Sequence, residues 1–233
     1  MRVKRALLFV MAIALPMTVH AQLTNLAARV LPATATKALS DSLKSASPHA
    51  RHIWRDTPAV NGDGTINAYI EISRGDRRKW EFDIAARARR IDRMMPPAVG
   101  GYPINYGFVP QTISYDGDPF DVLVLGPPLE GGRIVRGIAV GLMLMEDEKG
   151  PDSKVVVSMV DTHGTPLHRL TSQIQRDVAD YFGRYKKHLP GAFSRVPGWG
   201  SAKEGLSLVQ LTHAFFHQCR LPAASSCSVD KRQ

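Results

Sequence analysis

Residues 102–121 read YPINYGFVPQTISYDGDPFD, and this stretch ends with three carboxylates in one short turn. Asp116, Asp118 and Asp121 follow the pattern D-G-D-P-x-D, in which the glycine permits a tight turn and the proline stiffens it. The three side chains should therefore point into a common space. Two carboxylates about 4 Å apart repel by roughly 4 kcal/mol at an effective dielectric of about 20, so the cluster needs cations or shared protons. All-oxygen ligands favour hard divalent ions, above all Mg²⁺, with Mn²⁺ or another divalent ion as alternatives.

An isolated D-x-D motif is more often a solvated acidic turn than a site. In this chain an apolar run from Val122 to Leu125 follows the acids directly, and such a run predicts a buried strand. The position of the carboxylates at the mouth of a buried strand favours a ligand site over a solvated loop.

Further strands are predicted by alternating apolar and polar residues. Residues 68–73 and 79–83 both show this period of two. If the two segments pair as a hairpin, then Glu71, Lys79 and Glu81 share its polar face. The other strand-like runs are residues 121–125, 133–145 and 154–160. Five short strands without interleaved helices predict a small closed OB-like five-stranded β-barrel.

Two helices are predicted towards the C-terminal end. Residues 167–188 carry apolar side chains at helical spacing, and Pro166 suits the first turn of this helix. A second helix should begin at Ser201, where Ser201 and Glu204 form a capping box. The fold class is therefore mainly β with two C-terminal helices, an α+β chain.

Residues 1–21 have the pattern of a signal peptide. Three basic residues precede an apolar run, and Ala21 is the small residue that signal peptidases favour. The run is interrupted by Pro16 and is short for a membrane span; an uncleaved anchor is the alternative. Cleavage would remove three of the basic residues that give the chain its formal net charge of +9. We therefore expect a periplasmic or secreted protein with no stable membrane insertion after cleavage.

Residues 22–60 are rich in Ala, Ser, Thr and Leu, which is typical of an N-terminal extension or a linker. The two cysteines of the chain, Cys219 and Cys227, lie close to its C-terminal end. In an oxidising compartment a disulfide between them is favoured over free thiols, and it would stabilise the fold by about 2–3 kcal/mol in the chain-entropy model. Such a bond would tie down a tail of residues 218–233.

Charged and phenolic residues elsewhere complete a second pattern. The acids Asp147, Glu148 and Asp152 follow the run 133–145. Basic and phenolic residues accompany them, namely Lys79, Arg93, Lys154, Lys186, Tyr102, Tyr106 and Tyr185. Each alone would be an ordinary surface or core residue. Together, acids that hold several Mg²⁺ ions and Lys, Arg and Tyr donors make a site for a small polyphosphate.

The chain resembles the soluble family I inorganic pyrophosphatases, whose signature is the D-G-D-P-x-D segment. The resemblance extends from about residue 65 to 215 and places the pyrophosphatase domain at residues 61–217. The other matching segments are I-E-I at 70–72, K-W-E-F-D at 79–83, D-R-M-M at 92–95, Y-P-I-N-Y-G-F at 102–108, D-E-K-G-P-D-S-K at 147–154 and Y-F-G-R-Y-K at 181–186.

This resemblance implies metal-dependent hydrolysis of pyrophosphate to two orthophosphates by a metal-activated water, without a covalent intermediate. It assigns metal ions to Asp116, Asp121, Asp152, Asp147 and Glu81. In that assignment Asp121 bridges the first two ions, and Asp118 is the catalytic base that takes a proton from the water between them. The residues implied to bind the phosphoryl oxygens are Lys79, Arg93, Tyr106, Lys154, Tyr185 and Lys186, with Glu71, Tyr102 and Glu148 in supporting positions.

The resemblance also implies a homo-oligomer. Bacterial relatives that form hexamers commonly carry histidines in the helix turn at 180–184, where this chain has Asp180 and Arg184. The number of subunits therefore stays open.

A non-catalytic barrel that binds polyphosphate or nucleic acid is the alternative function. Such a module would present stacking aromatics along a basic groove, whereas the aromatics here are interleaved with carboxylates. An enzyme with no nucleic-acid partner is therefore favoured.

Two further motifs are set aside. Residues 61–66 hint at a calcium-binding loop, but Ala59 and Ile70 stand where its key carboxylates belong, so a turn is expected. His213 and His217 have the spacing of zinc ligands without the accompanying glutamate, so they are expected to be packing or surface residues.

Overall fold

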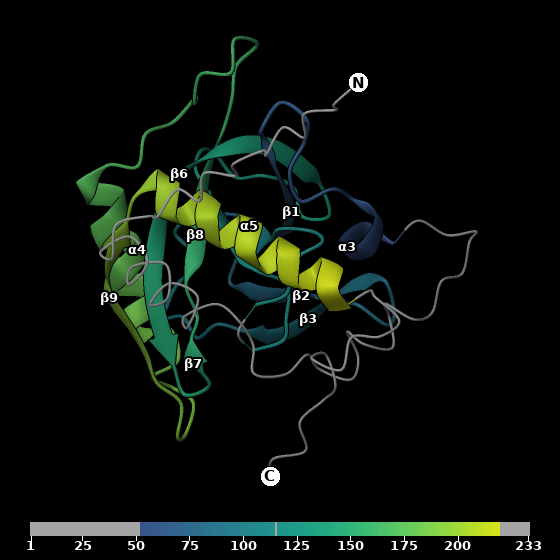
Figure 1. The fold of residues 1–233 in the computed structure, drawn as a ribbon. Coiled ribbons are helices and arrows are strands. Elements are labelled where there is room, and N and C mark those ends of the chain that lie inside the picture. Colours follow the sequence, from purple (N-terminus) through teal and green to yellow (C-terminus); the bar gives the residue numbers. More distant parts are fainter. Residues whose placement is uncertain (1–51, 115, 220–233) are drawn as a thin grey trace, which may run out of the picture.

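The computed structural model of the chain describes residues 52–114 and 116–219 (Figure 1). The expected signal peptide, most of the expected extension and Cys227 lie outside the described residues, so the disulfide stays a prediction. No helix within the described ranges is long and apolar enough to cross a membrane.

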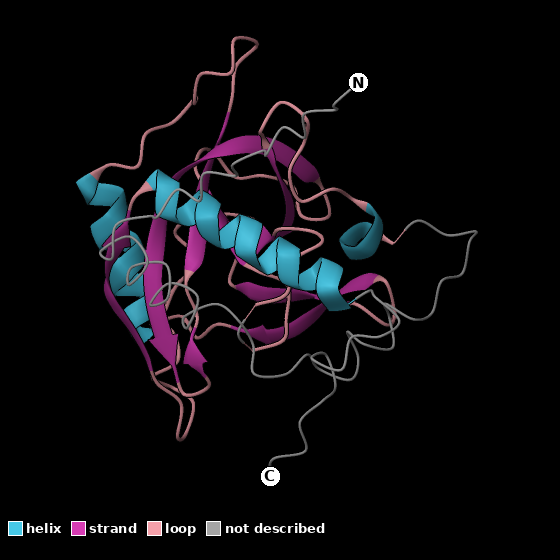
Figure 2. Cartoon of the chain, in the orientation of Figure 1, coloured by secondary structure: helices cyan, strands magenta, loops and turns pink. Residues whose placement is uncertain are grey.

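Short strands make up most of the described chain, and the two longer helices come late (Figure 2). In chain order, the elements are α3 (Ile53–Asp56), β1 (Ile66–Ile72), β2 (Arg78–Asp83), β3 (Ala88–Met94), β4 (Asn105–Phe108), β5 (Asp121–Val124), β6 (Ile134–Asp147), β7 (Gly150–Pro151), β8 (Lys154–Met159), α4 (Ser172–Arg184), β9 (Ser194–Gly200) and α5 (Ala202–Cys219).

Five strands form a closed ring in the order β1-β4-β5-β8-β6, and β6 pairs with β1 to complete it. β5 and β8 run parallel, while the other neighbours in the ring are antiparallel. β7 and β9 extend the sheet by pairing with β6. The expectation of a mainly β protein with five strands in a closed arrangement and helices at the C-terminal end is therefore confirmed.

One of the five predicted strands lies outside the ring. β2 pairs with β3 in a separate two-stranded sheet, so the expected hairpin between residues 68–73 and 79–83 is wrong. β4 occupies the fifth place instead, although it is only four residues long. A Cβ at Gly107 in β4 would lie 1.8 Å from the carbonyl oxygen of Tyr69, so glycine allows β4 to lie close against β1. The alternation of apolar and polar residues does not predict a strand as short as this one.

The first of the two main helices is shorter than predicted. α4 begins after Thr171, whose hydroxyl accepts a hydrogen bond from the backbone N–H of Ile174. Pro166 does not start the helix, because it forms a bridge with Val160 instead. The capping box of α5 is confirmed: Ser201 Oγ accepts from the backbone of Glu204 at 3.2 Å, and Glu204 Oε2 accepts from the backbone of Ser201 at 2.7 Å.

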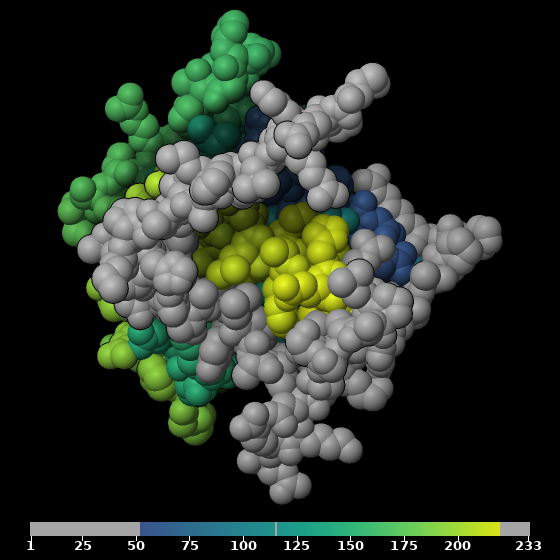
Figure 3. All heavy atoms as spheres, viewed as in Figure 1, coloured from purple at the N-terminus to yellow at the C-terminus, as the bar shows by residue number. Residues whose placement is uncertain are grey.

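The helices cover the strands on two sides. α5 lies across the ring in Figures 1 and 2, and its side chains occupy the centre of the same face in Figure 3. Leu208 and Val209 of α5 pack into the interior cluster of the ring with residues such as Val122 and Val155. α4 buries Val178, Tyr181 and Phe182 in a second cluster with Leu123, Met143 and Val156. Complete burial of one such aliphatic or aromatic side chain contributes about 1.5–3 kcal/mol. The core thus fixes the strand ends around which charged residues gather.

Gly107→Ala should destabilise the ring, because the added methyl group meets the backbone of β1. We expect a loss of about 1–3 kcal/mol or more in the free energy of unfolding, measured by urea denaturation. Gly183→Ala is the matched control: nothing lies within 4 Å of its added Cβ inside α4. That change should be neutral or stabilise the protein by about 0.5–1 kcal/mol. Equal stability of the two variants would contradict the close approach of β4 to β1.

Candidate active site

A cavity of about 570 Å³ opens between the β2–β3 sheet and the ends of the ring strands. All predicted site residues line it except Lys154 and Tyr102. Those that line it are Glu71, Lys79, Glu81, Arg93, Tyr106, Asp116, Asp118, Asp121, Asp147, Glu148, Asp152, Tyr185 and Lys186. Segments more than a hundred residues apart in sequence therefore meet at one place.

The acidic turn before β5 forms one wall of the cavity. Gly117 has a φ of +86°, a conformation that glycine adopts readily, and the backbone N–H of Asp118 donates to Asp116 Oδ1 at 3.1 Å. Both carboxyl groups are accessible from the cavity, yet the surrounding protein displaces much of their water. This desolvation, with the nearby charge of Asp116, raises the pKa of Asp118 to about 7, and the positive charge of Lys149 partly opposes the shift. Desolvation also raises the pKa of Asp116.

Lys154 is buried directly behind this wall. Its ammonium donates to Asp121 Oδ2 at 2.5 Å and to Asp152 Oδ1 at 2.8 Å, and only 1% of its side chain is exposed. Burial alone would lower the pKa of Lys154, but the charges of Asp121 and Asp152 outweigh it, so the pKa is raised. Burial raises the pKa of Asp152 to about 7. Lys154 is thus engaged with two carboxylates rather than lining the cavity.

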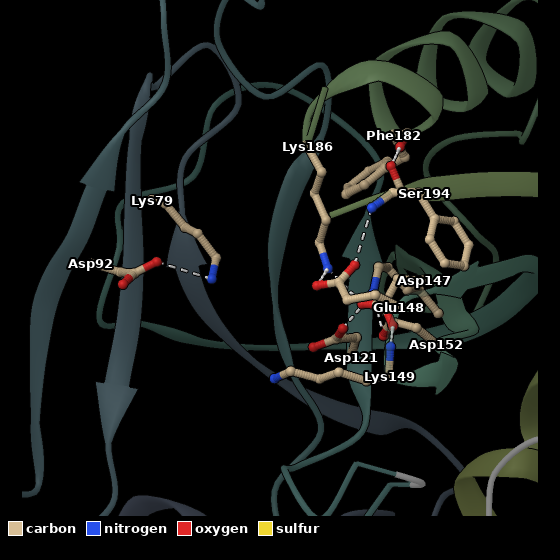
Figure 4. A network of polar contacts seen from close by, with 12 residues as sticks. Lys79, Asp92, Asp121, Asp147, Glu148, Lys149, Asp152, Phe182, Lys186 and Ser194 are labelled. Atoms are coloured by element: carbon tan, nitrogen blue, oxygen red, sulfur yellow. Dashed lines mark hydrogen bonds and ion pairs between the residues drawn. The ribbon is translucent and has the colours of Figure 1, made fainter. Parts of the chain in front are cut away.

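Two further lysines stand on opposite sides of the cavity (Figure 4). Lys186 donates to Asp147 Oδ2 at 2.6 Å and to Glu148 Oε1 at 2.9 Å. Across from it, Lys79 donates to Glu81 Oε1 at 2.5 Å. Several cations and acids of the site are therefore held as ion pairs: Lys186, which follows α4, pairs with acids at the end of β6, whereas Lys79 and Glu81 both belong to β2.

Asp92 is a site residue that the sequence analysis missed. Its carboxylate accepts from Lys79 Nζ at 3.2 Å and lies 3.4 Å from Arg93 Nη1, so it spans two predicted substrate-binding cations. Its position next to Arg93 was the available signal, but an Asp beside an Arg is common in exposed strands. Lys149 and Arg90 also line the cavity and were not predicted.

Tyrosines provide hydroxyl donors at the cavity. Burial raises the pKa of Tyr106 and of Tyr185 well above the usual value, so both remain protonated. Tyr102 does not line the cavity. It is 1% exposed and packs against Tyr106, with 5.7 Å between the ring centroids, so it supports its neighbour from behind.

Glu71 links β1 to the separate β2–β3 sheet. Its Oε1 accepts from the backbone N–H of Phe82 at 2.6 Å, and burial raises its pKa to about 8. Glu71, Lys79 and Glu81 line one cavity although their strands do not pair as a hairpin. The polar cluster expected from the hairpin therefore forms, although β1 and β2 belong to different sheets.

The carboxylates fit a divalent cation by their chemistry. Desolvation raises the pKa of Asp116, Asp118 and Asp152, so a cation bound beside them would favour their charged forms. Oxygen donors of this type bind Mg²⁺. In the described ranges no three His, Cys, Asp or Glu side chains are gathered as a ready-made metal site, and lysines hold several of the acids.

The motifs set aside earlier lie outside this cavity. In the 61–66 turn, Asp63 accepts from Arg136 Nη2 at 2.7 Å, so an arginine occupies its carboxylate. His213 Nδ1 donates to the carbonyl oxygen of Gln111 at 2.7 Å, and its ring stacks on Phe216. These contacts agree with the turn and the packing role expected for them.

Comparison with known proteins identifies the family and the fold. The family model described as inorganic pyrophosphatase matches residues 68–217. An inorganic pyrophosphatase from Sulfolobus acidocaldarius is 32% identical over 162 residues, which cover 66% of this chain and 93% of that protein. One from Rickettsia prowazekii is 36% identical over 160 residues, covering 65% of this chain and 92% of that protein.

Solved structures give the same result. The inorganic pyrophosphatase from Thermus thermophilus superposes with a TM-score of 0.65 at 32% identity, and the match covers 72% of this chain and 99% of that one. The one from Coxiella burnetii gives a TM-score of 0.63 at 35% identity, covering 69% and 99%. Because the family match includes the acidic turn, the ring and both walls of the cavity, the chain belongs to the inorganic pyrophosphatase family, whose members hydrolyse pyrophosphate to orthophosphate.

Proposed function

We propose that this protein hydrolyses pyrophosphate with Mg²⁺ as its working cofactor, and that the cavity is the active site. The observation that carries the proposal is the pairing pattern of the cavity acids. Asp121, Asp152, Asp147 and Glu81 are all ion-paired with lysines, whereas Asp116 and Asp118 have no ion-pair partner among the described residues. Asp118 is thus free to accept a proton, while Asp116 and the ion-paired acids can hold cations.

Asp116, Asp121 and Asp152 would hold the first metal ions, with Asp147 and Glu81 as further ligands. Such ions, when bound, polarise phosphoryl oxygens and make a bound water more acidic. Asp118 lies between Asp116 and Asp121 on the same turn, so its carboxylate is placed to take the proton from the attacking water. No side chain needs to form a covalent bond to phosphorus.

The basic residues would hold the phosphoryl oxygens. Arg93 lines the cavity, and its buried Nε has no hydrogen-bond partner among the described residues. A buried donor left without a partner is costly, so an anionic oxygen is its natural acceptor. Lys79 and Lys186 are held in place by their acids and can share their remaining protons with the substrate. Tyr106 and Tyr185 add neutral donors.

The proposal also includes the oligomeric state, without the number of subunits. We infer a homo-oligomer from the family, but Arg184 is engaged within the chain: it donates to Asp180 Oδ2 at 2.9 Å and to the carbonyl oxygen of Ala98 at 3.0 Å. A subunit contact through this helix turn would have to accommodate those bonds.

Mg²⁺ dependence is the first test of the proposal. Purified protein should release orthophosphate from pyrophosphate only with added Mg²⁺, and a chelator should abolish the activity, because the cation would polarise the phosphoryl oxygens and make the attacking water more acidic. Phosphate release is measured with and without chelator, with ATP and tripolyphosphate as comparison substrates. Full activity in metal-free buffer would refute the cofactor assignment.

The base and the ligands can be separated by substitution. Asp118→Asn keeps the volume but removes the proton acceptor, so kcat should fall by about 10²–10⁴-fold with little change in the Mg²⁺ requirement. Asp121→Asn should instead raise the Mg²⁺ concentration needed for half-maximal rate, because it removes charge from a ligand. Asp177→Asn, on the exposed side of α4, is the control and should leave both quantities unchanged. Near-normal turnover of Asp118→Asn at saturating Mg²⁺ would assign the base elsewhere.

We also propose that the protein is exported and acts in the periplasm or outside the cell. The support is the signal-peptide pattern of residues 1–21. The mature chain should begin near Gln22, which N-terminal sequencing of the protein from the periplasmic fraction and the medium will test. Recovery of the protein only from the cytoplasm with Met1 in place would contradict export.

A further inference from the structure

The cations around the cavity differ in whether a carboxylate lies at ion-pair distance from them. Lys79, Arg90, Arg93, Lys154 and Lys186 each have a carboxylate partner at ion-pair distance. Lys149 also lines the cavity, but within residues 52–114 and 116–219 it has no ion-pair partner. Its positive charge is therefore uncompensated by a direct contact, whereas the charge of the other cations is already largely neutralised.

The position of Lys149 is fixed while its side chain remains free. It lies in the tight turn between β6 and β7, where its backbone N–H donates to Asp147 Oδ1 at 2.8 Å. Its side chain is exposed, and in Figure 4 it extends from this turn towards the side of the view on which Lys79 stands. The charge of Lys149 also opposes the rise in the pKa of Asp116 and of Asp118, so the ammonium lies near the acidic turn. An exposed cation without an ion-pair partner among the described residues thus lines a cavity whose other cations are paired.

We propose that Lys149 is a substrate-binding residue that contacts an outer phosphoryl group of pyrophosphate as the anion enters the cavity, a role that rests on the proposed function. A free ammonium can meet an anion without first breaking an ion pair, so it is available at the first encounter. The backbone bond to Asp147 fixes where the side chain starts, and its length lets it follow the substrate. Lys149 would therefore act on binding and on the rate of capture rather than on the chemical step.

The test is a KM-against-kcat comparison for Lys149→Ala, with pyrophosphate as the substrate at fixed free Mg²⁺. A charge contact at about 4 Å in water-like surroundings changes binding about fivefold, so KM should rise by about that factor while kcat stays within about twofold. The difference from the wild type should shrink as the salt concentration approaches about 1 M, where screening acts over about 3 Å. Lys149→Arg should restore the KM.

Lys203→Ala removes the same charge from an exposed position outside the cavity and should leave KM unchanged. The substitution Lys149→Ala keeps the backbone bond to Asp147, so the thermal unfolding midpoint should also stay the same. An unchanged KM, an equal rise in KM for Lys203→Ala, or a loss confined to kcat would each overturn the inference. Wild-type protein that releases no orthophosphate would overturn the proposed function and this inference with it, whereas active wild type with an unaffected Lys149→Ala variant overturns the inference alone.

Discussion

The ion-paired group formed by Lys154, Asp121 and Asp152 is the interaction on which both the ring and the site depend. β5 begins at Asp121 and β8 begins at Lys154, and the two strands run parallel with Val122 opposite Val155. This register brings the first residue of each strand to the same edge of the sheet, so the ammonium meets the carboxylate at 2.5 Å. Removing one partner of a buried charged pair typically costs about 3–5 kcal/mol, so this edge is fixed firmly.

Everything else in the cavity is arranged around that edge. β6 passes beside β8 and ends at Asp147, and the end of α4 brings Tyr185 and Lys186 to meet it. From the opposite side, Glu71 holds the β2–β3 sheet through the backbone of Phe82. The site is therefore assembled from the ends of elements that a shared hydrophobic core positions, which is why its side chains can be separated widely in sequence.

The part of this arrangement that sequence predicts is the part with local chemistry. Three patterns predict a structure from only a few neighbouring residues. They are the D-G-D-P-x-D turn, the apolar run after Asp121 and the capping box at Ser201. The pairing of β2 with β3 is not predicted by a local pattern. β3 has the sequence ARRIDRM and is largely exposed, so it lacks the alternation of buried residues that indicates a strand. β4 fits into the ring because Gly107 has no side chain that would collide with the neighbouring strand β1. Asp92 and Lys149 became recognisable as site residues only through their neighbours in space.

The ion pairs also bear on how binding events depend on one another. Lys154 and Lys186 neutralise carboxylates that the family resemblance gives to metal ions, and the same two lysines are expected to hold phosphoryl oxygens. A lysine ammonium has three protons, so a proton that it donates to a carboxylate is not available to a phosphate oxygen. Charge supplied to the acids by divalent ions would release lysine donors for the substrate, so occupancy of the acids and affinity for the anion should be thermodynamically coupled in both directions. Divalent ions on the acids and the anion on the lysines would then favour each other's binding.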